Sequence, residues 1–139
     1  MTANTNPIFS RTPDVQWAAP PVSAANTTRD GTSGSIAAVF TADATEGGRI
    51  EKIIARPLGT NVATVLRVFL NNGGGTGTAA NNALIAEMTL PATALSEVAA
   101  QPAYELALNL ALPPGYMIFC TIGTAVAAGY MLSGVGSKY

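Results

Sequence analysis

The segment Tyr104-Glu-Leu-Ala-Leu-Asn-Leu-Ala-Leu112 decides the fold of this chain. Its large apolar side chains all share one parity, and the positions between them hold Glu, Ala and Asn. A repeat of two residues is that of a β-strand, in which successive side chains point to opposite faces of a sheet. Pro113-Pro114-Gly115 follows directly and forces a turn. The segment therefore predicts a strand with one buried face.

Similar short segments lie on both sides of this strand and are separated by turns rich in Gly, Pro and Asn. The one helical candidate is Ala92 to Ala100, where we expect a short helix or a loop because Pro91 and Pro102 bound it. About seven or eight short strands with almost no helix predict an all-β, antiparallel two-sheet sandwich, and eight strands would make it a jelly roll. The other expected strands are residues 35–41, 49–56, 62–70, 84–90, 116–122 and 129–135.

Residues 1–34 differ from residues 35–139, which we expect to form the sandwich domain. The first segment is rich in Pro, Asn, Ser and Thr, which favour neither helix nor sheet. It also carries large apolar side chains, which ordinary disordered tails lack. We therefore expect an extended N-terminal arm that docks on a partner; the alternative is that the arm folds back on its own domain. The candidate partner-binding residues are Ile8, Phe9, Val15 and Trp17.

The charge content limits the kinds of partner. Charged residues make up 11% of the 139 residues, and the formal net charge is −1. Binding to nucleic acid or to an anionic membrane needs a cationic surface, so neither is expected as a partner. A surface with few charges does little to keep monomers apart, which points to a homo-oligomer or a larger assembly.

Catalytic and metal-binding patterns are absent from the sequence. The chain has no histidine and one cysteine, Cys120, which lies in a strand-like apolar run and is expected to be a small buried hydrophobe. These counts exclude a Ser/His/Asp triad and a Cys/His metal site. A pair of carboxylates acting on sugars stays open but is disfavoured by the low aromatic content of 6%. We therefore expect no enzyme and no cofactor. The N-terminus lacks the pattern of a signal peptide, and no apolar stretch is long enough to span a membrane as a helix.

One loop resembles a dinucleotide-binding fingerprint. Gly75-Thr-Gly-Thr-Ala-Ala80 fits the pattern G-x-G-x-x-A and follows a strand-like run. The fingerprint needs a helix after the glycines, and here Asn81-Asn82 and another strand follow. We therefore predict that residues 71–82 form the tip of a hairpin, either free in solvent or ordered against a neighbour.

Two segments resemble small proteins that tailed bacteriophages encode near their capsid genes. They are Arg56-Pro-Leu-Gly-Thr-Asn-Val-Ala-Thr-Val-Leu-Arg-Val-Phe-Leu-Asn71 and the C-terminal stretch from Leu112-Pro-Pro-Gly-Tyr116 to Gly136-Ser-Lys-Tyr139. These proteins resemble jelly-roll capsid cement, or decoration, proteins, and the likeness covers residues 35–139.

The resemblance implies a virion protein on the outer capsid surface. Such a protein binds the major capsid protein as a dimer or trimer and stiffens the shell. We expect it to bridge capsid subunits, and we expect deletion of residues 1–34 to abolish binding while the sandwich stays folded. The alternatives are a tail- or fibre-associated virion module and a carbohydrate-binding β-sandwich.

Overall fold

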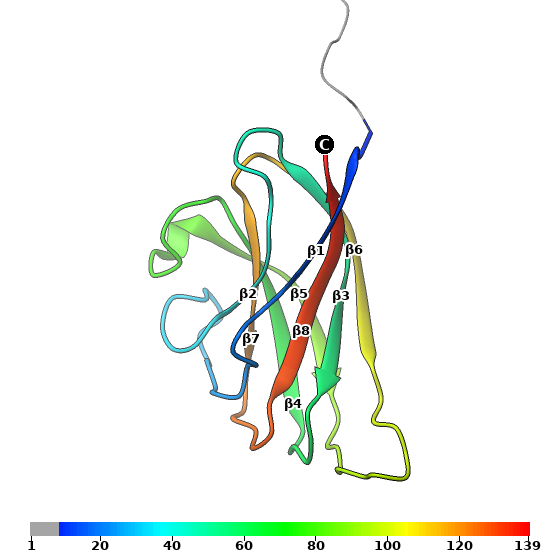
Figure 1. Ribbon diagram of the computed structural model, residues 1–139. Coiled ribbons are helices and arrows are strands. Elements are labelled where there is room, and N and C mark those ends of the chain that lie inside the picture. Colours follow the sequence, from blue (N-terminus) through cyan, green and yellow to red (C-terminus); the bar gives the residue numbers. More distant parts are fainter. Residues whose placement is uncertain (1–8) are drawn as a thin grey trace, which may run out of the picture.

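The computed structural model describes residues 9–139, which form two antiparallel sheets that face each other as a sandwich (Figure 1). A single 3₁₀ turn, η1 (Ala79–Asn81), is the helical element in these residues. The expected all-β sandwich is confirmed, and residues 92–100 form a loop. The strands are β1 (Thr12–Trp17), β2 (Ala37–Thr41), β3 (Gly48–Pro57), β4 (Thr64–Asn71), β5 (Asn82–Leu90), β6 (Tyr104–Leu112), β7 (Met117–Ile122) and β8 (Tyr130–Lys138).

The strand order is that of a jelly roll. Sheet A has the order β1-β8-β3-β6, and sheet B has the order β2-β7-β4-β5. The first strand pairs with the last, β2 with β7, β3 with β6 and β4 with β5. The chain is thus one long hairpin wrapped into two layers, which is how a jelly roll places eight strands.

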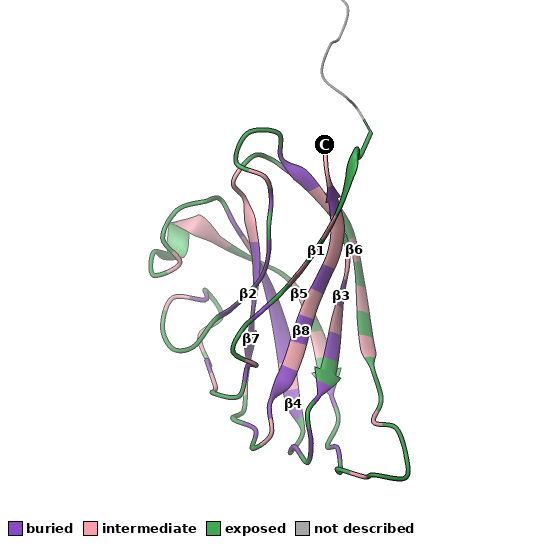
Figure 2. Cartoon of the chain, in the orientation of Figure 1, coloured by how far each residue is buried: buried purple, intermediate pink, exposed green. Residues whose placement is uncertain are grey.

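The core lies between the sheets and is formed mainly by the central strands. Figure 2 shows buried residues concentrated on these strands and mixed exposure on β6. Burial in β6 alternates along its length, as the pattern of residues 104–112 predicts. Removing such side chains from water is the main force that holds the two layers together. The largest fully buried side chains include Phe40, Ile50, Ile53, Leu66, Ile118, Tyr130 and Leu132.

The N-terminal segment joins the sandwich, which corrects the expected boundary at residue 34. Residues Thr12 to Trp17 pair with Lys138 to Ser133 along the whole of β1. A proline lacks the N–H that a central strand must donate, but β1 is an edge strand and tolerates Pro13. Ala18 and Val22 then enter the core. From residue 12 onward, the alternative in which this segment folds back on its own domain describes the structure.

Residues 24–34, which we call the strap, cover the outer face of sheet B. Phe69 and Phe119 stack there with ring centroids 5.0 Å apart, and both are fully buried. A Cβ at Gly31 would lie 2.8 Å from the Phe119 ring, so the strap backbone lies directly on this pair. The Asn26 N–H donates to the Ile122 carbonyl at 2.8 Å. The strap therefore shields the Phe69–Phe119 pair on this outer face from solvent.

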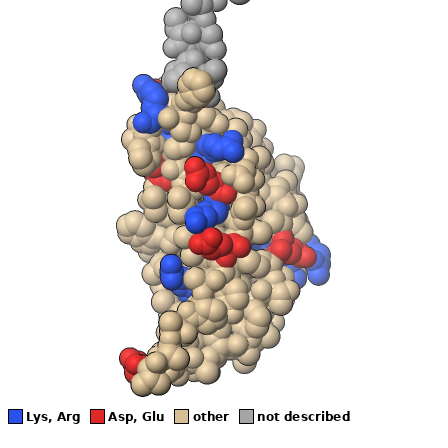
Figure 3. Space-filling view, turned by 90° about the vertical axis from the view of Figure 1, so that its right-hand side faces the viewer, with Lys and Arg blue, Asp and Glu red and all other residues tan. Residues whose placement is uncertain are grey.

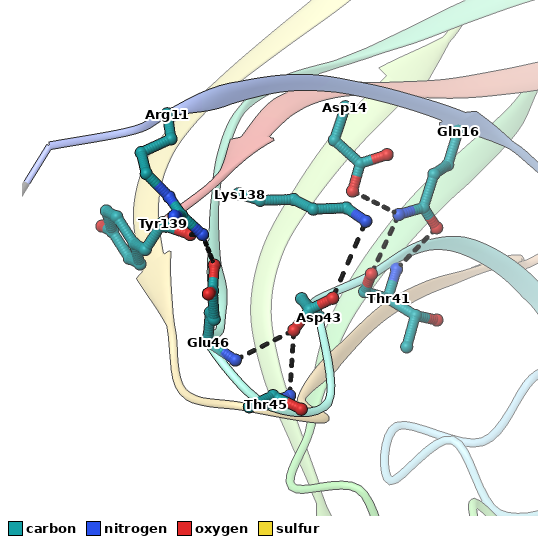
Figure 4. Close-up of polar contacts among 9 residues, drawn as sticks. All are labelled: Arg11, Asp14, Gln16, Thr41, Asp43, Thr45, Glu46, Lys138 and Tyr139. Atoms are coloured by element: carbon teal, nitrogen blue, oxygen red, sulfur yellow. Dashed lines mark hydrogen bonds and ion pairs between the residues drawn. The ribbon is translucent and has the colours of Figure 1, made fainter. Parts of the chain in front are cut away.

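A side-chain amide closes the sandwich between β1 and β2. Gln16 Nε2 donates to the Thr41 carbonyl, and Gln16 Oε1 accepts from the Thr41 N–H, both at 2.9 Å (Figure 4). The amide thus satisfies backbone groups on the free edge of β2 that would otherwise be open to another strand. Asp14 Oδ2 accepts a further hydrogen bond from Gln16 Nε2 at 3.0 Å.

Replacing this amide should weaken the contact between β1 and β2 without unfolding the chain. We expect Gln16→Leu to lower the free energy of unfolding by about 1 kcal/mol, because two partly solvated hydrogen bonds are lost. Urea unfolding followed by circular dichroism measures the change. Thr41→Val is the matched control, because it keeps the backbone groups and the β-branched shape, and a loss as large as that of Gln16→Leu would contradict the role of the amide.

Candidate binding surface

The outer face of sheet A carries an exposed apolar surface. Val15 and Trp17 lie on β1 with 55% and 62% of their surface exposed. We define the sheet A face as these two residues together with three partly exposed side chains of the neighbouring strands, Ile54, Met131 and Val135. Since the strap lies on sheet B, residues 9–139 leave this face uncovered while they cover part of the opposite one. Exposed apolar side chains that gather on one face commonly mark a protein interaction site.

Strand register brings these residues together. Val15 lies directly opposite Val135, and Trp17 lies opposite Ser133, whose other neighbour is Ile54. Directly paired residues have Cβ atoms about 5 Å apart and share a face of the sheet, so these side chains lie on one face across three strands, with Ser133 between Trp17 and Ile54 and with Lys52 beside Val135.

Charges of both signs border the apolar surface. Lys52 Nζ lies 3.3 Å from Glu105 Oε1, and Glu51 and Arg56 are exposed on the same sheet. Figure 3 shows acidic and basic side chains alternating along one column, while most of the remaining surface in that view is uncharged. Balanced charges of this kind fix the orientation of a partner more than they strengthen its binding.

A polar cluster joins Arg11 and the two C-terminal residues to the turn between β2 and β3 (Figure 4). Arg11 forms an ion pair with Glu46 and donates to the Tyr139 carbonyl at 3.2 Å, and Lys138 Nζ lies 3.7 Å from Asp43 Oδ2.

The same turn holds the Asp43 carboxylate. The backbone N–H groups of Glu46 and Thr45, together with Lys138, hold the pKa of Asp43 below its usual value, because each stabilises the ionised form. The cluster fixes the start of β1 and therefore the place from which Val15 and Trp17 project.

The structure brings two of the four predicted partner-binding residues onto one surface. Val15 and Trp17 share the outer face of β1, whereas Phe9 is 74% exposed and precedes both this strand and the Arg11 anchor. Ile8 lies outside the described residues. Sequence reasoning missed Ile54, Met131 and Val135. Met131 and Val135 share a parity in an expected strand, and assigning faces to that strand would have identified them.

The loop at residues 71–82 is the tip of the β4–β5 hairpin, as predicted. Asn71 and Asn82 pair across its base. Asn81 Nδ2 donates to the Gly75 carbonyl at 3.0 Å and Asn82 Nδ2 to the Thr76 carbonyl at 2.8 Å, so side-chain amides order the turn.

The remaining features are the cysteine, metal-ligating side chains and membrane-spanning helices. Cys120 is fully buried as expected, and burial raises the pKa of its thiol above the usual value. Within residues 9–139, no three His, Cys, Asp or Glu side chains gather in a group that could hold a metal ion. No helix in this part of the chain is long and apolar enough to cross a membrane.

In comparisons with known proteins, no family model, no curated protein and no solved structure matches this chain.

Proposed function

We propose that this chain is a structural virion protein that binds the outer surface of a bacteriophage capsid and stabilises the shell by bridging capsid subunits. The observation that supports it best is the exposed sheet A face on a sandwich whose other outer face is partly covered by its own strap. The resemblance of residues 56–71 and 112–139 to capsid cement proteins supports the choice of partner.

The mechanism needs no chemical step. A tryptophan at the centre of a contact surface is a common source of binding energy, because it buries a large rigid side chain. On this proposal Trp17 and Val15 pack against capsid protein, and the bordering charges set the orientation. Each bound copy adds an interface that must break before the shell opens, so binding favours the closed shell by mass action.

Trp17 also provides the assay. It is the sole tryptophan of the chain, so its fluorescence reports this face alone. Mixing the protein with empty shells should shift its emission to shorter wavelength as the indole leaves water. We expect Trp17→Ala to weaken shell binding by about 30-fold, measured by co-sedimentation, because a tryptophan anchor buried at an interface contributes about 2 kcal/mol.

Val62→Ala is the matched control, because Val62 is 56% exposed outside the sheet A face. Circular dichroism must show that both variants are folded. Equal shell binding by Trp17→Ala and the wild-type chain would refute docking through this face. Co-sedimentation with tails but not with shells would instead favour the tail-associated role.

A further inference from the structure

The hairpin tip at residues 71–82 holds the sole Asn-Gly step of the chain, Asn72-Gly73. Both residues are exposed. Asparagine is a thermally labile residue, because the backbone nitrogen of the next residue can attack the carbon of its carboxamide. Glycine at that next position has no side chain to hinder the attack. The proposed function makes no use of this step.

The turn holds the Asn72 carboxamide against the backbone that follows it. Asn72 Oδ1 accepts from the Gly74 N–H at 3.0 Å, so the side chain folds over the Gly73 peptide. Asn72 Nδ2 donates to Asn81 Oδ1 at 3.3 Å on the other arm of the tip. Groups that are already held together lose little further freedom when they react, and this favours a reaction within the chain.

The hydrogen bond from the Gly74 N–H also favours the chemistry. When a nitrogen adds to the carboxamide carbon, negative charge develops on Asn72 Oδ1, and a backbone N–H aimed at that oxygen stabilises the charge. One contact opposes the reaction. The Gly73 N–H donates to Asn71 Oδ1 at 2.8 Å, and this bond must break before the nitrogen loses its proton. Because Gly73 is exposed, water can take the place of this acceptor.

We infer that Asn72 is a self-modification site, at which the chain cyclises onto Gly73 and loses the side-chain amide. The Gly73 nitrogen bonds to Asn72 Cγ, the Cγ–Nδ2 bond breaks, and ammonia leaves with the proton of the Gly73 N–H. Water then opens the cyclic imide at either of its carbonyls, giving aspartate or isoaspartate. The net reaction consumes water and releases ammonia, and nothing is oxidised or reduced.

The related step Asp30-Gly31 in the strap is protected. A carboxyl group must be protonated to be attacked, whereas hydrogen bonds from the hydroxyl and the backbone N–H of Thr32 hold the pKa of Asp30 below its usual value. Gly31 is also buried against the Phe119 ring. The structure therefore directs the reaction to Asn72.

The product carries a new carboxylate on the hairpin tip. The formal charge of the chain becomes one unit more negative than −1. Isoaspartate also adds a methylene group to the main chain beside the turn between β6 and β7, since a Cβ at Gly73 would lie 3.2 Å from the Gly115 carbonyl oxygen. This turn lies outside the core, so the modified chain should stay folded. The reaction needs no partner, so the inference does not rest on the proposed function.

The first test incubates the purified chain in mildly alkaline buffer and follows each asparagine by peptide mass spectrometry. We expect Asn72 to be converted at least about tenfold faster than Asn82, because Ala83 places a Cβ beside the attacking nitrogen. Anion-exchange chromatography should resolve a more acidic form that grows with time. Asn72→Ser is the matched control, because it removes the carboxamide from the same exposed turn, and it should give no such form.

A second test repeats the incubation with the chain unfolded in guanidinium chloride, which separates the effect of the turn from that of the Asn-Gly step. We expect folded Asn72 to react within about tenfold of the unfolded rate or faster, because the turn already holds the reacting groups together. A folded rate that is lower by more than this factor would overturn the inference. Equal conversion of Asn72 and Asn82 in the folded chain, or no conversion of either, would also overturn it.

Discussion

A chain shortened to residues 35–139 is expected to lose the cooperative fold, which corrects the expectation from the sequence that the sandwich stays folded without residues 1–34. The deletion removes β1, whose six residues pair with β8, and takes Ala18 and Val22 out of the core. It also removes the strap and exposes Phe69 and Phe119, each of which contributes about 1.5–3 kcal/mol when buried. The total loss is on the order of 5 kcal/mol or more, which is as large as the whole stability of many domains.

Circular dichroism and urea unfolding of the shortened chain measure this loss. A chain that begins at Phe9 is the matched control, because it keeps every contact of the described residues, and it should unfold at the wild-type urea concentration. The result also determines how shell-binding data for this chain are interpreted. If the 35–139 chain is unfolded, its loss of shell binding reports unfolding and not the removal of a contact. If the shortened chain unfolds at the wild-type urea midpoint, β1 and the strap make no measurable contribution to the free energy of unfolding.

Gly136→Ala is expected to have the next largest effect. Gly136 lies in β8 between Ile50 of β3 and Asp14 of β1, so backbone approaches it from both sides. An added Cβ would meet the Arg49 carbonyl oxygen well inside van der Waals contact and would lie 3.0 Å from the buried Phe40 ring. Alanine stabilises a strand by at most about 1 kcal/mol relative to glycine. A clash with backbone that cannot move aside costs about 3 kcal/mol or more, so destabilisation wins.

The glycine loop supplies the control for Gly136. Gly75→Ala and Gly77→Ala place a Cβ where no atom lies within 4 Å. Both variants should unfold within about 0.5 kcal/mol of the wild-type chain, as open surface positions do. If Gly136→Ala unfolds at the same urea concentration as these controls, the backbone around β8 can shift far enough to accommodate the added Cβ.

Most strands of this fold can be predicted from the sequence. One face of each strand is buried, so apolar and polar residues alternate along it. Residues 104–112 form β6 with the bounds that the alternation predicts, and residues 116–122 differ from β7 by one residue. β1 escaped prediction because edge strands tolerate Pro13 and expose alternate apolar residues, so composition indicated an arm. What composition cannot reveal is the pairing partner: β1 is a strand because β8 lies beside it.

The candidate binding surface was only partly predictable for the same reason. Trp17 and Val15 can be identified from the sequence, because they are large apolar residues in a polar segment. Their companions come from β3 and β8, far away in sequence, and join them through strand register alone. Arg67 pairs with Glu87 of the neighbouring strand β5. Its burial depends on the strap, because the Asn26 carbonyl accepts from Arg67 Nη1 at 3.5 Å, and this contact cannot be read from the sequence.

The nesting of strand pairs has a consequence for how the chain acquires its fold. β4 and β5 are joined by a ten-residue hairpin tip, whereas β1 and β8 are separated by nearly the full chain. The entropy of loop closure rises with the number of residues enclosed, so the inner pair should form first and the outer pair last. During synthesis β1 is made before the other seven strands of the sandwich, and it cannot pair until β8 has been made. In pulse-labelled hydrogen exchange we therefore expect amide protection in β4 and β5 before β1, and simultaneous protection would show that the sandwich forms in a single step.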